Sequence, residues 1–323
     1  MLRPTRLAEF NGQEAIRNNL QIAITSAQRQ NKPLGHMLFT GDAGLGKTTL
    51  ASSVIPEEMG GEVKFINCAA VSKPQELTST ITLLKEGDFL FLDELHALPN
   101  QLRELLLTYM EDSRLSVTYE TNGQSQVLDL ELPKTTVLGA TTRMGNLDGP
   151  LRSRFGHIFR LEAYTDEELY HIGAWHFSHK QLKIADEAMH VLARAARGTA
   201  RTLVNLIESA IDTFMAADPD GRMITAEQVE QTLHRLGYQI RTVKNRVYYL
   251  SPMEWEYIMC FPDPRATVGL KTLSALLSES QQTVEEVYEP ALLRGKIIQR
   301  TSGGRELLEV GHLIHLEERA KQC

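Results

Sequence analysis

The chain has 323 residues, 42% of them hydrophobic, and its 34 Lys and Arg against 41 Asp and Glu give a formal net charge of −7. This length predicts two or three domains, and the acidic balance does not favour general nucleic-acid binding, so any basic surface for DNA must be local. The three cysteines are scattered and give neither a disulfide framework nor zinc-site spacing, as expected in a reducing compartment. Because no secretory signal pattern or membrane-spanning apolar run is found, we expect a cytoplasmic protein with no membrane partner.

The N-terminal segment is expected to lead through a helix into a strand. Pro4 disfavours helix before it, so residues 2–4 are expected to be extended. Apolar residues from Ile16 to Ile24 predict one face of a helix, and the apolar run 37–39 predicts a strand.

Residues 41–49 fit the phosphate-binding pattern G-x-x-x-x-G-K-[ST]. Glycines allow the backbone to form a concave nest whose N–H groups point at phosphates. Lys47 would place a positive charge on the β and γ phosphates, and the Thr48 hydroxyl would ligate Mg²⁺. The alternative is a glycine turn with an incidental lysine, but the predicted strand before the loop and helix after it favour the nucleotide site.

Two further strands are predicted after this loop. Pro56 is expected to end or kink the helix that follows the loop, and residues 63–66 predict a strand. The apolar run 89–92 predicts a buried parallel strand that ends in Asp93 and Glu94. Asp93 would hold Mg²⁺ and Glu94 would polarise the attacking water, whereas the simpler alternative is a strand that stops at a solvated acidic turn.

A helix over 98–109 and a hairpin over 115–132 are expected next, with the hairpin turn at Asn122-Gly123. Its register is not predicted. Residues 135–143 predict another strand that ends in polar groups, where a hydroxyl or a guanidinium would lie beside the γ-phosphate.

A short polar turn then carries Arg152 and Arg154. Isolated arginines of this kind are most often solvated surface residues. The alternative is an arginine finger, a cation delivered to the nucleotide of a neighbouring subunit to stabilise the transferred phosphoryl group.

From Thr165 onward the pattern is entirely helical, beginning with a capping box. Further helices are predicted over 184–197 and 199–217, with a short fourth helix from Thr225. His171, His176 and His179 do not share one helical face, so a metal site is not favoured.

Residues 239–246 are polar, show no periodicity and are expected to be a linker. Three short helices (253–260, 270–277 and 284–292) and a hairpin over 296–310 then predict a winged helix, which binds nucleic acid or protein. Residues 246–323 hold nine Lys and Arg against eleven Asp and Glu, a net charge of −2, so the wing could be a protein contact. Cations nevertheless gather on or beside the hairpin and could contact phosphates: Arg294, Lys296, Arg300 and Arg305.

The ordered set of motifs resembles the RuvB family, the bacterial Holliday-junction branch-migration ATPases of the AAA+ class. The likeness runs almost end to end and rests on motifs in this order: Leu2-Arg3-Pro4, Glu9-Phe10, Gly12-Gln13, Gly44-Leu45-Gly46-Lys47-Thr48-Thr49, Asp93-Glu94-Leu95-His96, Met110-Glu111-Asp112, Gly139-Ala140-Thr141-Thr142-Arg143, Pro150-Leu151-Arg152, Arg154-Phe155-Gly156, Arg197-Gly198-Thr199-Ala200-Arg201, Val287-Tyr288-Glu289-Pro290 and Gln299-Arg300-Thr301.

The resemblance implies an α/β fold: an AAA+ P-loop core with a parallel sheet, a helical lid and a C-terminal winged helix, over residues 1–162, 163–240 and 241–323. It also implies ATP and Mg²⁺ as cofactors. The implied catalytic residues are Lys47, Asp93, Glu94, Thr142 as the first sensor, and Arg154 as the trans-acting finger. The implied nucleotide-binding residues are Leu2, Arg3, Gly44, Gly46, Lys47, Thr48, Thr49, Glu111, Asp112, Ser113, Tyr164 and Arg201, the last being the second sensor. Thr48 and Asp93 would hold the metal, and Arg300 and Arg305 would touch DNA.

The chain departs from the family pattern in several places. Asp42-Ala43 stand where the family usually has two prolines, and Ala200 replaces a proline before the sensor arginine. Glu208 and Asp212 lie in a helix that is strongly basic in the family, and the second strand of the wing carries Glu306 and Glu309. The resemblance is therefore strongest at the nucleotide site.

The expected function is that of a Mg-ATP-driven hexameric motor that moves double-stranded DNA through four-way junctions, with a RuvA-like protein docking on hairpin 115–132. One alternative is a protein remodeller whose winged helix grips a protein. Another is an adaptor in which nucleotide binding only switches partner binding.

Overall fold

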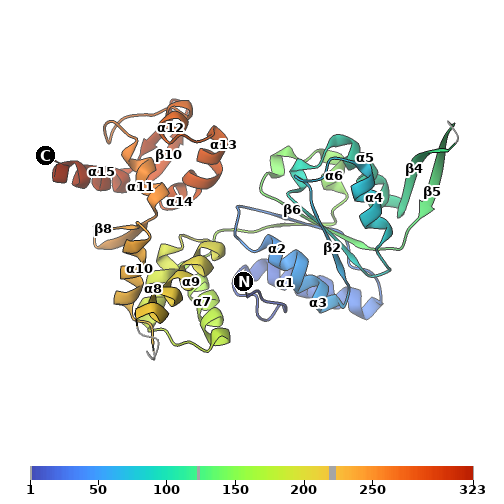
Figure 1. Ribbon diagram of the computed structural model, residues 1–323, viewed down its shortest axis with the longest axis horizontal. Helices are drawn as coiled ribbons and strands as arrows, with labels where there is room; N and C mark the ends of the chain where they lie inside the picture. The colour runs from blue at the N-terminus through green and yellow to red at the C-terminus, as the bar shows by residue number, and fades with distance from the viewer. Residues whose placement is uncertain (1, 122–123, 218–222, 323) are drawn as a thin grey trace. The chain divides into compact units, whose positions relative to one another are not determined.

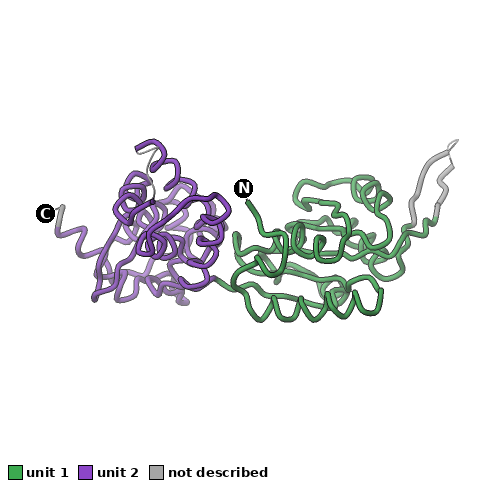
Figure 2. The backbone as a smooth tube through the Cα atoms, turned by 90° about the horizontal axis from the view of Figure 1, so that it is seen from below, with its two compact units in different colours: residues 1–163 green, residues 164–323 purple. Residues whose placement is uncertain are grey.

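The computed structural model describes residues 2–121, 124–217 and 223–322, in two compact units numbered 1–163 and 164–323. Figure 2 colours the two units separately. The finer division at 162 and at 240 stays a prediction. Within the described residues, the helices are too short or too polar for any of them to cross a membrane.

The first unit is built on a five-stranded parallel sheet in the order β2-β3-β6-β1-β7. The strands are β1 (Met37–Thr40), β2 (Val63–Asn67), β3 (Phe89–Asp93), β6 (Thr136–Thr141) and β7 (His157–Arg160). Every residue of β1 and β6 is buried, as expected of central parallel strands that are covered on both faces. The predicted strands are confirmed, and β7 was missed because this edge strand buries only Phe159.

Helices cover the two faces of this sheet. In Figure 1, α1 (Glu14–Gln30), α2 (Lys47–Thr49) and α3 (Ile55–Met59) lie on one side, and α4 (Pro74–Thr82), α5 (Asn100–Asp112) and α6 (Gly149–Ser153) lie on the other. The second group packs through apolar side chains on the sheet and on the short 3₁₀ turn η2 (Leu95–Ala97). A second 3₁₀ turn, η3 (Met144–Asn146), precedes α6.

The helical run after the phosphate-binding loop does not end at Pro56, but it departs from regular α-helix geometry directly before this residue. A π-helical segment, η1 (Leu50–Val54), joins α2 to α3, and the helical run continues to Met59. A proline ring clashes with the carbonyl four residues earlier in a regular α-helix, and a wider π turn relieves that crowding. The same arrangement recurs later, where η4 (Val284–Tyr288) precedes Pro290.

The predicted hairpin is confirmed as β4 (Arg114–Thr121) and β5 (Gln124–Glu131). Its register, which the sequence left open, pairs Arg114 with Glu131, and the two side chains form an ion pair of 2.7 Å. The predicted turn at Asn122-Gly123 lies outside the described residues.

The second unit begins with the four predicted helices. These are α7 (Asp166–Lys180), α8 (Asp186–Ala195), α9 (Ala200–Ala217) and α10 (Ala226–Arg235). The capping box at Thr165 and Glu168 is confirmed, and a second one starts α10. These caps satisfy N–H groups that would otherwise lack partners at the start of each helix.

Residues 239–246 are not a linker but part of a hairpin, β8 (Gln239–Val243) and β9 (Arg246–Leu250). The connecting residues Lys244 and Asn245 both have positive φ, of 48° and 61°, which is typical of a tight two-residue hairpin turn. Sequence patterning missed this hairpin because polar side chains also pack in it: the Arg241 guanidinium lies 4.7 Å from the centre of the Trp255 ring.

The winged helix is confirmed. Its elements are α11 (Pro252–Met259), α12 (Leu270–Leu276), α13 (Gln281–Thr283) with η4 and α14 (Glu289–Arg294), and the wing strands β10 (Ile298–Thr301) and β11 (Gly304–Leu307). The second strand ends earlier than expected, because Glu309 begins a further helix, α15 (Glu309–Gln322). An apolar cluster from Val243 to Ile314 forms the core of this part.

Candidate nucleotide-binding and catalytic site

The phosphate-binding loop connects β1 to α2 at the carboxyl edge of the sheet. Its glycines adopt positive φ: 134° at Gly41, 80° at Gly44 and 101° at Gly46. A Cβ atom at Gly41 would lie 2.5 Å from the Leu161 carbonyl oxygen, so a side chain is excluded there. This backbone forms the concave nest that the sequence predicts for phosphates.

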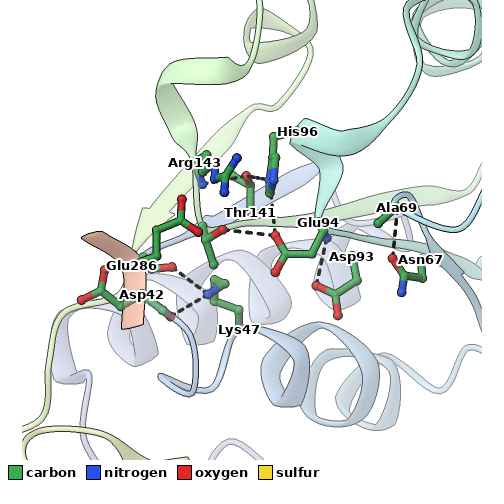
Figure 3. Close-up of polar contacts among 12 residues, drawn as sticks. Asp42, Lys47, Asn67, Ala69, Asp93, Glu94, His96, Thr141, Arg143 and Glu286 are labelled. Carbon is green, nitrogen blue, oxygen red and sulfur yellow. Dashed lines mark hydrogen bonds and ion pairs between the residues drawn. The ribbon is translucent and has the colours of Figure 1, made fainter. Parts of the chain in front are cut away.

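Lys47 begins α2 and is almost completely buried. Its Nζ donates hydrogen bonds of 2.7 Å to the carbonyl oxygens of Gly41 and Asp42, so the cation lies inside the loop (Figure 3). A positive charge at this place suits the phosphate tail of a nucleotide.

Thr48 and Asp93 come together from α2 and β3, with 3.4 Å between Thr48 Oγ1 and Asp93 Oδ2. A hydroxyl and a carboxylate at this separation fit Mg²⁺, which prefers hard oxygen ligands. Burial raises the pKa of Asp93, although the Glu94 N–H, Lys47 and the Thr48 hydroxyl act in the opposite direction. A bound dication would favour the ionised carboxylate at this position.

Glu94 follows Asp93 in a left-handed conformation with φ of 49°. Its Oε2 atom accepts a hydrogen bond of 3.3 Å from Thr142 Oγ1, at the end of β6, and lies 3.3 Å from His96 Nδ1. His96 Nδ1 also lies 3.0 Å from Thr141 Oγ1 (Figure 3). The ends of β3 and β6 therefore bring Asp93, Glu94 and Thr142 together.

Sequence reasoning assigned no role to His96 or Thr141, although both are in motifs that carry the family resemblance. Thr142 donates a hydrogen bond to Glu94 Oε2, and His96 Nδ1 lies 3.3 Å from the same oxygen. The sequence signal for a role of His96 was its place two residues after Glu94 in the motif Asp-Glu-x-His. The 3₁₀ turn Leu95–Ala97 explains this spacing, because it brings the His96 imidazole near Glu94.

Two uncharged groups line the outer side of Asp93. Asn67 at the end of β2 pairs in register with Asp93, and its Oδ1 atom accepts the Ala69 N–H at 3.0 Å. The next residue, Cys68, is buried, and burial together with the charges of Asp93 and Glu94 raises the pKa of its thiol to about 12. Cys68 is therefore an uncharged packing residue at this edge of the sheet.

Arg154 is the residue at the C-terminal end of α6. Its guanidinium forms an ion pair with Glu111, in the last turn of α5, and the Arg154 side chain is 37% exposed. Asp112 and Ser113 follow directly, and Ser113 has a φ of 52°. The structure thus groups Arg154 with the predicted nucleotide-binding residues of segment 111–113 rather than with Lys47 or Asp93.

The remaining predicted nucleotide contacts belong to different units. Leu2 and Arg3 lie in the first unit and are exposed. Tyr164 and Arg201 lie in the second, where the Tyr164 N–H donates to the Gly198 carbonyl oxygen at 2.9 Å. Their contacts with a nucleotide stay predictions.

The two predicted DNA contacts on the wing are held by carboxylates. Arg305 is largely buried and donates from Nε to Glu289 at 2.8 Å and from a terminal nitrogen to Glu285 at 2.7 Å. Arg300 donates to the other oxygen of Glu289 at 2.6 Å, and its side chain is 44% exposed. Their DNA contacts stay predictions, and in this structure the carboxylates of Glu285 and Glu289 would compete with a phosphate for both guanidinium groups.

Comparisons with known proteins cover most of the chain. A family profile described as the Holliday junction DNA helicase RuvB P-loop domain matches residues 2–161, and one described as the RuvB C-terminal winged helix domain matches residues 248–314. The Holliday junction branch migration complex subunit RuvB of Campylobacter fetus is 38% identical over 306 residues, covering 95% of this chain and 86% of that protein. The chain belongs to the RuvB family.

Solved structures agree with this assignment. The Holliday junction branch migration motor RuvB of Thermotoga maritima matches with a TM-score of 0.83 and 32% identity, covering 98% of each chain. A mutant of that protein matches with a TM-score of 0.85 and 32% identity, covering 98% of this chain and 99% of the other. RuvB from a Nitratiruptor species is 36% identical over 94% of this chain and 88% of its own length. The predicted family, and with it the P-loop ATPase core and the winged helix, is confirmed.

Proposed function

We propose that this RuvB-family protein is an ATP-driven motor that promotes branch migration of four-way DNA junctions, and that it hydrolyses Mg-ATP at the seam between two copies of the chain. The observation that carries the proposal is the cluster of Lys47, Thr48, Asp93, Glu94 and Thr142 at one edge of the sheet, in a chain of this family. These groups supply what phosphoryl transfer to water needs from one subunit.

Within one copy, the loop N–H groups and Lys47 would bind and orient the phosphates. Thr48 and Asp93 would hold Mg²⁺, which when bound would offset phosphate charge and fix the geometry of the tail.

Glu94 would act as the general base or water-positioning group. Thr142 donates a hydrogen bond to its Oε2 atom, His96 Nδ1 lies 3.3 Å away, and a carboxylate has further lone pairs that can accept a proton or a hydrogen bond from water. Thr142 would contact the γ-phosphate as well, which is supported by the pairing of β6 with β1, the strand that leads into the phosphate-binding loop.

The other half of the site would come from a neighbouring copy, through Arg154. Its side chain is partly exposed, on a helix end where a partner subunit can reach it. The ion pair with Glu111 would be exchanged for phosphate oxygens on assembly, with segment 111–113 forming the rim. Arginine fingers typically contribute a factor of about 10³–10⁵ in rate, so activity should depend on assembly. We expect a hexameric ring.

The partner surfaces follow from the same proposal. The winged helix would contact the phosphate backbone of double-stranded DNA, and hairpin 115–132 would dock a RuvA-like protein. The location would be the cytoplasm, where the chromosome is available.

ATPase rate per subunit, measured over a dilution series, tests the trans site. The expected rate falls as the assembly dissociates, and Arg154→Ala removes most of the activity at every concentration. Arg152→Ala is the matched control, because it removes an exposed arginine from the same helix and should preserve the rate. A rate per subunit that is constant across dilution and unchanged in Arg154→Ala would contradict the trans mechanism.

A second candidate function is a remodeller whose winged helix grips a protein. It is favoured by one observation: Arg300 and Arg305 of the wing form ion pairs with Glu285 and Glu289, which leaves their charges less available to DNA phosphates. A synthetic four-way junction with ATP, with and without RuvA, separates the two. Strand products and a DNA-stimulated ATPase with steep salt dependence support the motor. ATP hydrolysis without strand products would favour the remodeller, and junction binding switched by nucleotide without hydrolysis would favour an adaptor.

A further inference from the structure

Arg103 is a half-buried cation in α5 with all of its guanidinium nitrogens engaged. Nε donates to the Leu98 carbonyl oxygen at 2.8 Å, and one terminal nitrogen donates to the His96 carbonyl oxygen at 2.9 Å. The other terminal nitrogen lies 3.6 Å from Asp148 Oδ2, and the Arg103 side chain is only 16% exposed. None of the roles assigned above includes this residue.

The two carbonyls belong to the turn that directly follows the catalytic carboxylates. The 3₁₀ turn Leu95–Ala97 directly follows Glu94 and contains His96, whose Nδ1 lies 3.3 Å from Glu94 Oε2, and Leu98 ends the turn. Arg103 therefore supports the backbone that places the water-activating group within its own subunit.

The third partner of Arg103, Asp148, belongs to the N-terminus of α6, the helix that carries the proposed arginine finger. Its Oδ1 atom accepts the Leu151 N–H at 2.9 Å, which makes it the N-cap of α6. Arg154 ends that helix and is paired with Glu111 of α5. Helix α5 thus holds both ends of α6, through Arg103 at the start and through Glu111 at the end.

We infer that Arg103 is a positioning residue which fixes the loop of Glu94 and the helix of Arg154 relative to one another, so that one subunit's cis and trans catalytic groups share one support. This inference rests on the proposed trans site. An arginine is required because a planar fork can serve two carbonyls and a carboxylate together, whereas a lysine presents a single nitrogen.

Mixed assemblies can assign the effect to one side of the seam. Lys47→Ala chains lack a working nucleotide site but can donate Arg154, and Arg154→Ala chains have the site but cannot donate. An equimolar mixture should regain ATPase activity that neither variant has alone. Arg103→Met, which keeps an unbranched apolar stem, is then added either to the Lys47→Ala chain, called the donor, or to the Arg154→Ala chain, called the acceptor.

The expected result is a decrease of the regained rate in both placements, by roughly tenfold, because small displacements of catalytic groups are costly. The KM for ATP in the acceptor placement should stay within a factor of two, since Arg103 does not touch the phosphate-binding loop. Arg103→Lys should restore only part of the rate. A regained rate that is undiminished in either placement would overturn the inference.

Asp148→Asn separates positioning from folding, because asparagine is as good an N-cap as aspartate but does not attract Arg103 by charge. In the donor chain it should lower the regained rate several-fold with an unchanged unfolding midpoint, and in the acceptor chain it should have little effect. A neutral Asp148→Asn donor would refute the link through α6. If the mixture of Lys47→Ala and Arg154→Ala chains that retain Arg103 is inactive, the proposed trans site is wrong and the inference fails with it. If that mixture is active but its rate does not change on Arg103→Met, only the inference about Arg103 is wrong.

Discussion

Glu289 is the centre of a buried ionic cluster in the winged helix, and its replacement gives a sharp test of how the wing is held. Glu289 is fully buried and accepts hydrogen bonds from the Tyr257 hydroxyl at 3.1 Å, from Arg305 at 2.8 Å and from Arg300 at 2.6 Å. Burial and the Glu289 carboxylate raise the pKa of Tyr257, so this hydroxyl stays protonated and donates. Glu289→Gln keeps the shape and removes the charge.

The expected loss in the free energy of unfolding follows from the ion pairs that remain after Glu289→Gln. Removing one partner from a buried ion pair costs about 3–5 kcal/mol, because the remaining charge is left uncompensated. Arg305, whose side chain is 11% exposed, keeps only its ion pair with Glu285, so we expect about 3 kcal/mol for Glu289→Gln. Arg300→Ala should cost less than about 1 kcal/mol, since its side chain is 44% exposed.

Fluorescence can follow this part of the chain alone. The two tryptophans are Trp175 in α7 and Trp255 in α11, so a Trp175→Phe background leaves the winged helix as the only emitter. Urea unfolding curves then give the free energy of unfolding for each variant. If Glu289→Gln lowers the free energy of unfolding as little as Arg300→Ala does, Arg305 is not a structural cation. The DNA-contacting role that the family resemblance implies for Arg305 would then be favoured.

Three further predictions concern the first unit and the helical part of the second. Glu94→Gln should bind ATP with unchanged affinity and hydrolyse it about 10²–10⁴-fold more slowly, as single-turnover assays can measure, with exposed Glu104→Gln as a control. Burial lowers the pKa of His176 to about 4 from 6.5, so the unfolded state binds the proton more readily. The contribution of His176 to stability should therefore be fully present above pH 6.5 and be lost, by up to ~3 kcal/mol, as the pH drops toward 4; in a Trp255→Phe background, unfolding followed through Trp175 should show a smaller pH slope in His176→Leu. Cys68 should resist alkylation in the folded chain at pH 8 and react only on unfolding, because burial raises its thiol pKa to about 12; rapid labelling of its peptide in mass spectra would contradict this.

Sequence alone could predict the elements whose chemistry is local. The phosphate-binding loop needs glycines at positive φ followed by Lys47, and that requirement is written directly in the residues. The apolar runs before Asp93 and Thr142 predict buried parallel strands, and parallel strands place their carboxyl ends on one edge, so the candidate catalytic cluster follows from topology.

What the sequence did not reveal depends on contacts between distant segments. The support that Arg103 gives to Asp148 joins residues 45 positions apart, and nothing in either segment's pattern announces it. The wing arginines are a second example. Their clustering in the sequence predicted a phosphate contact, whereas their ion pairs with buried Glu289 form only because α14 packs against the wing strands. The continuation of the helical run past Pro56 was not predicted because π-helical segments are rare and leave no regular signature in the sequence.

The central claim, that catalysis is shared between two copies, is tested most directly by ATP hydrolysis in a mixture of Lys47→Ala and Arg154→Ala chains. If one copy supplies the lysine-lined loop and the other the guanidinium, the mixture regains a substantial part of the wild-type rate although each variant alone is inactive. A mixture as inactive as its two components, under conditions where both still assemble, would contradict the shared site.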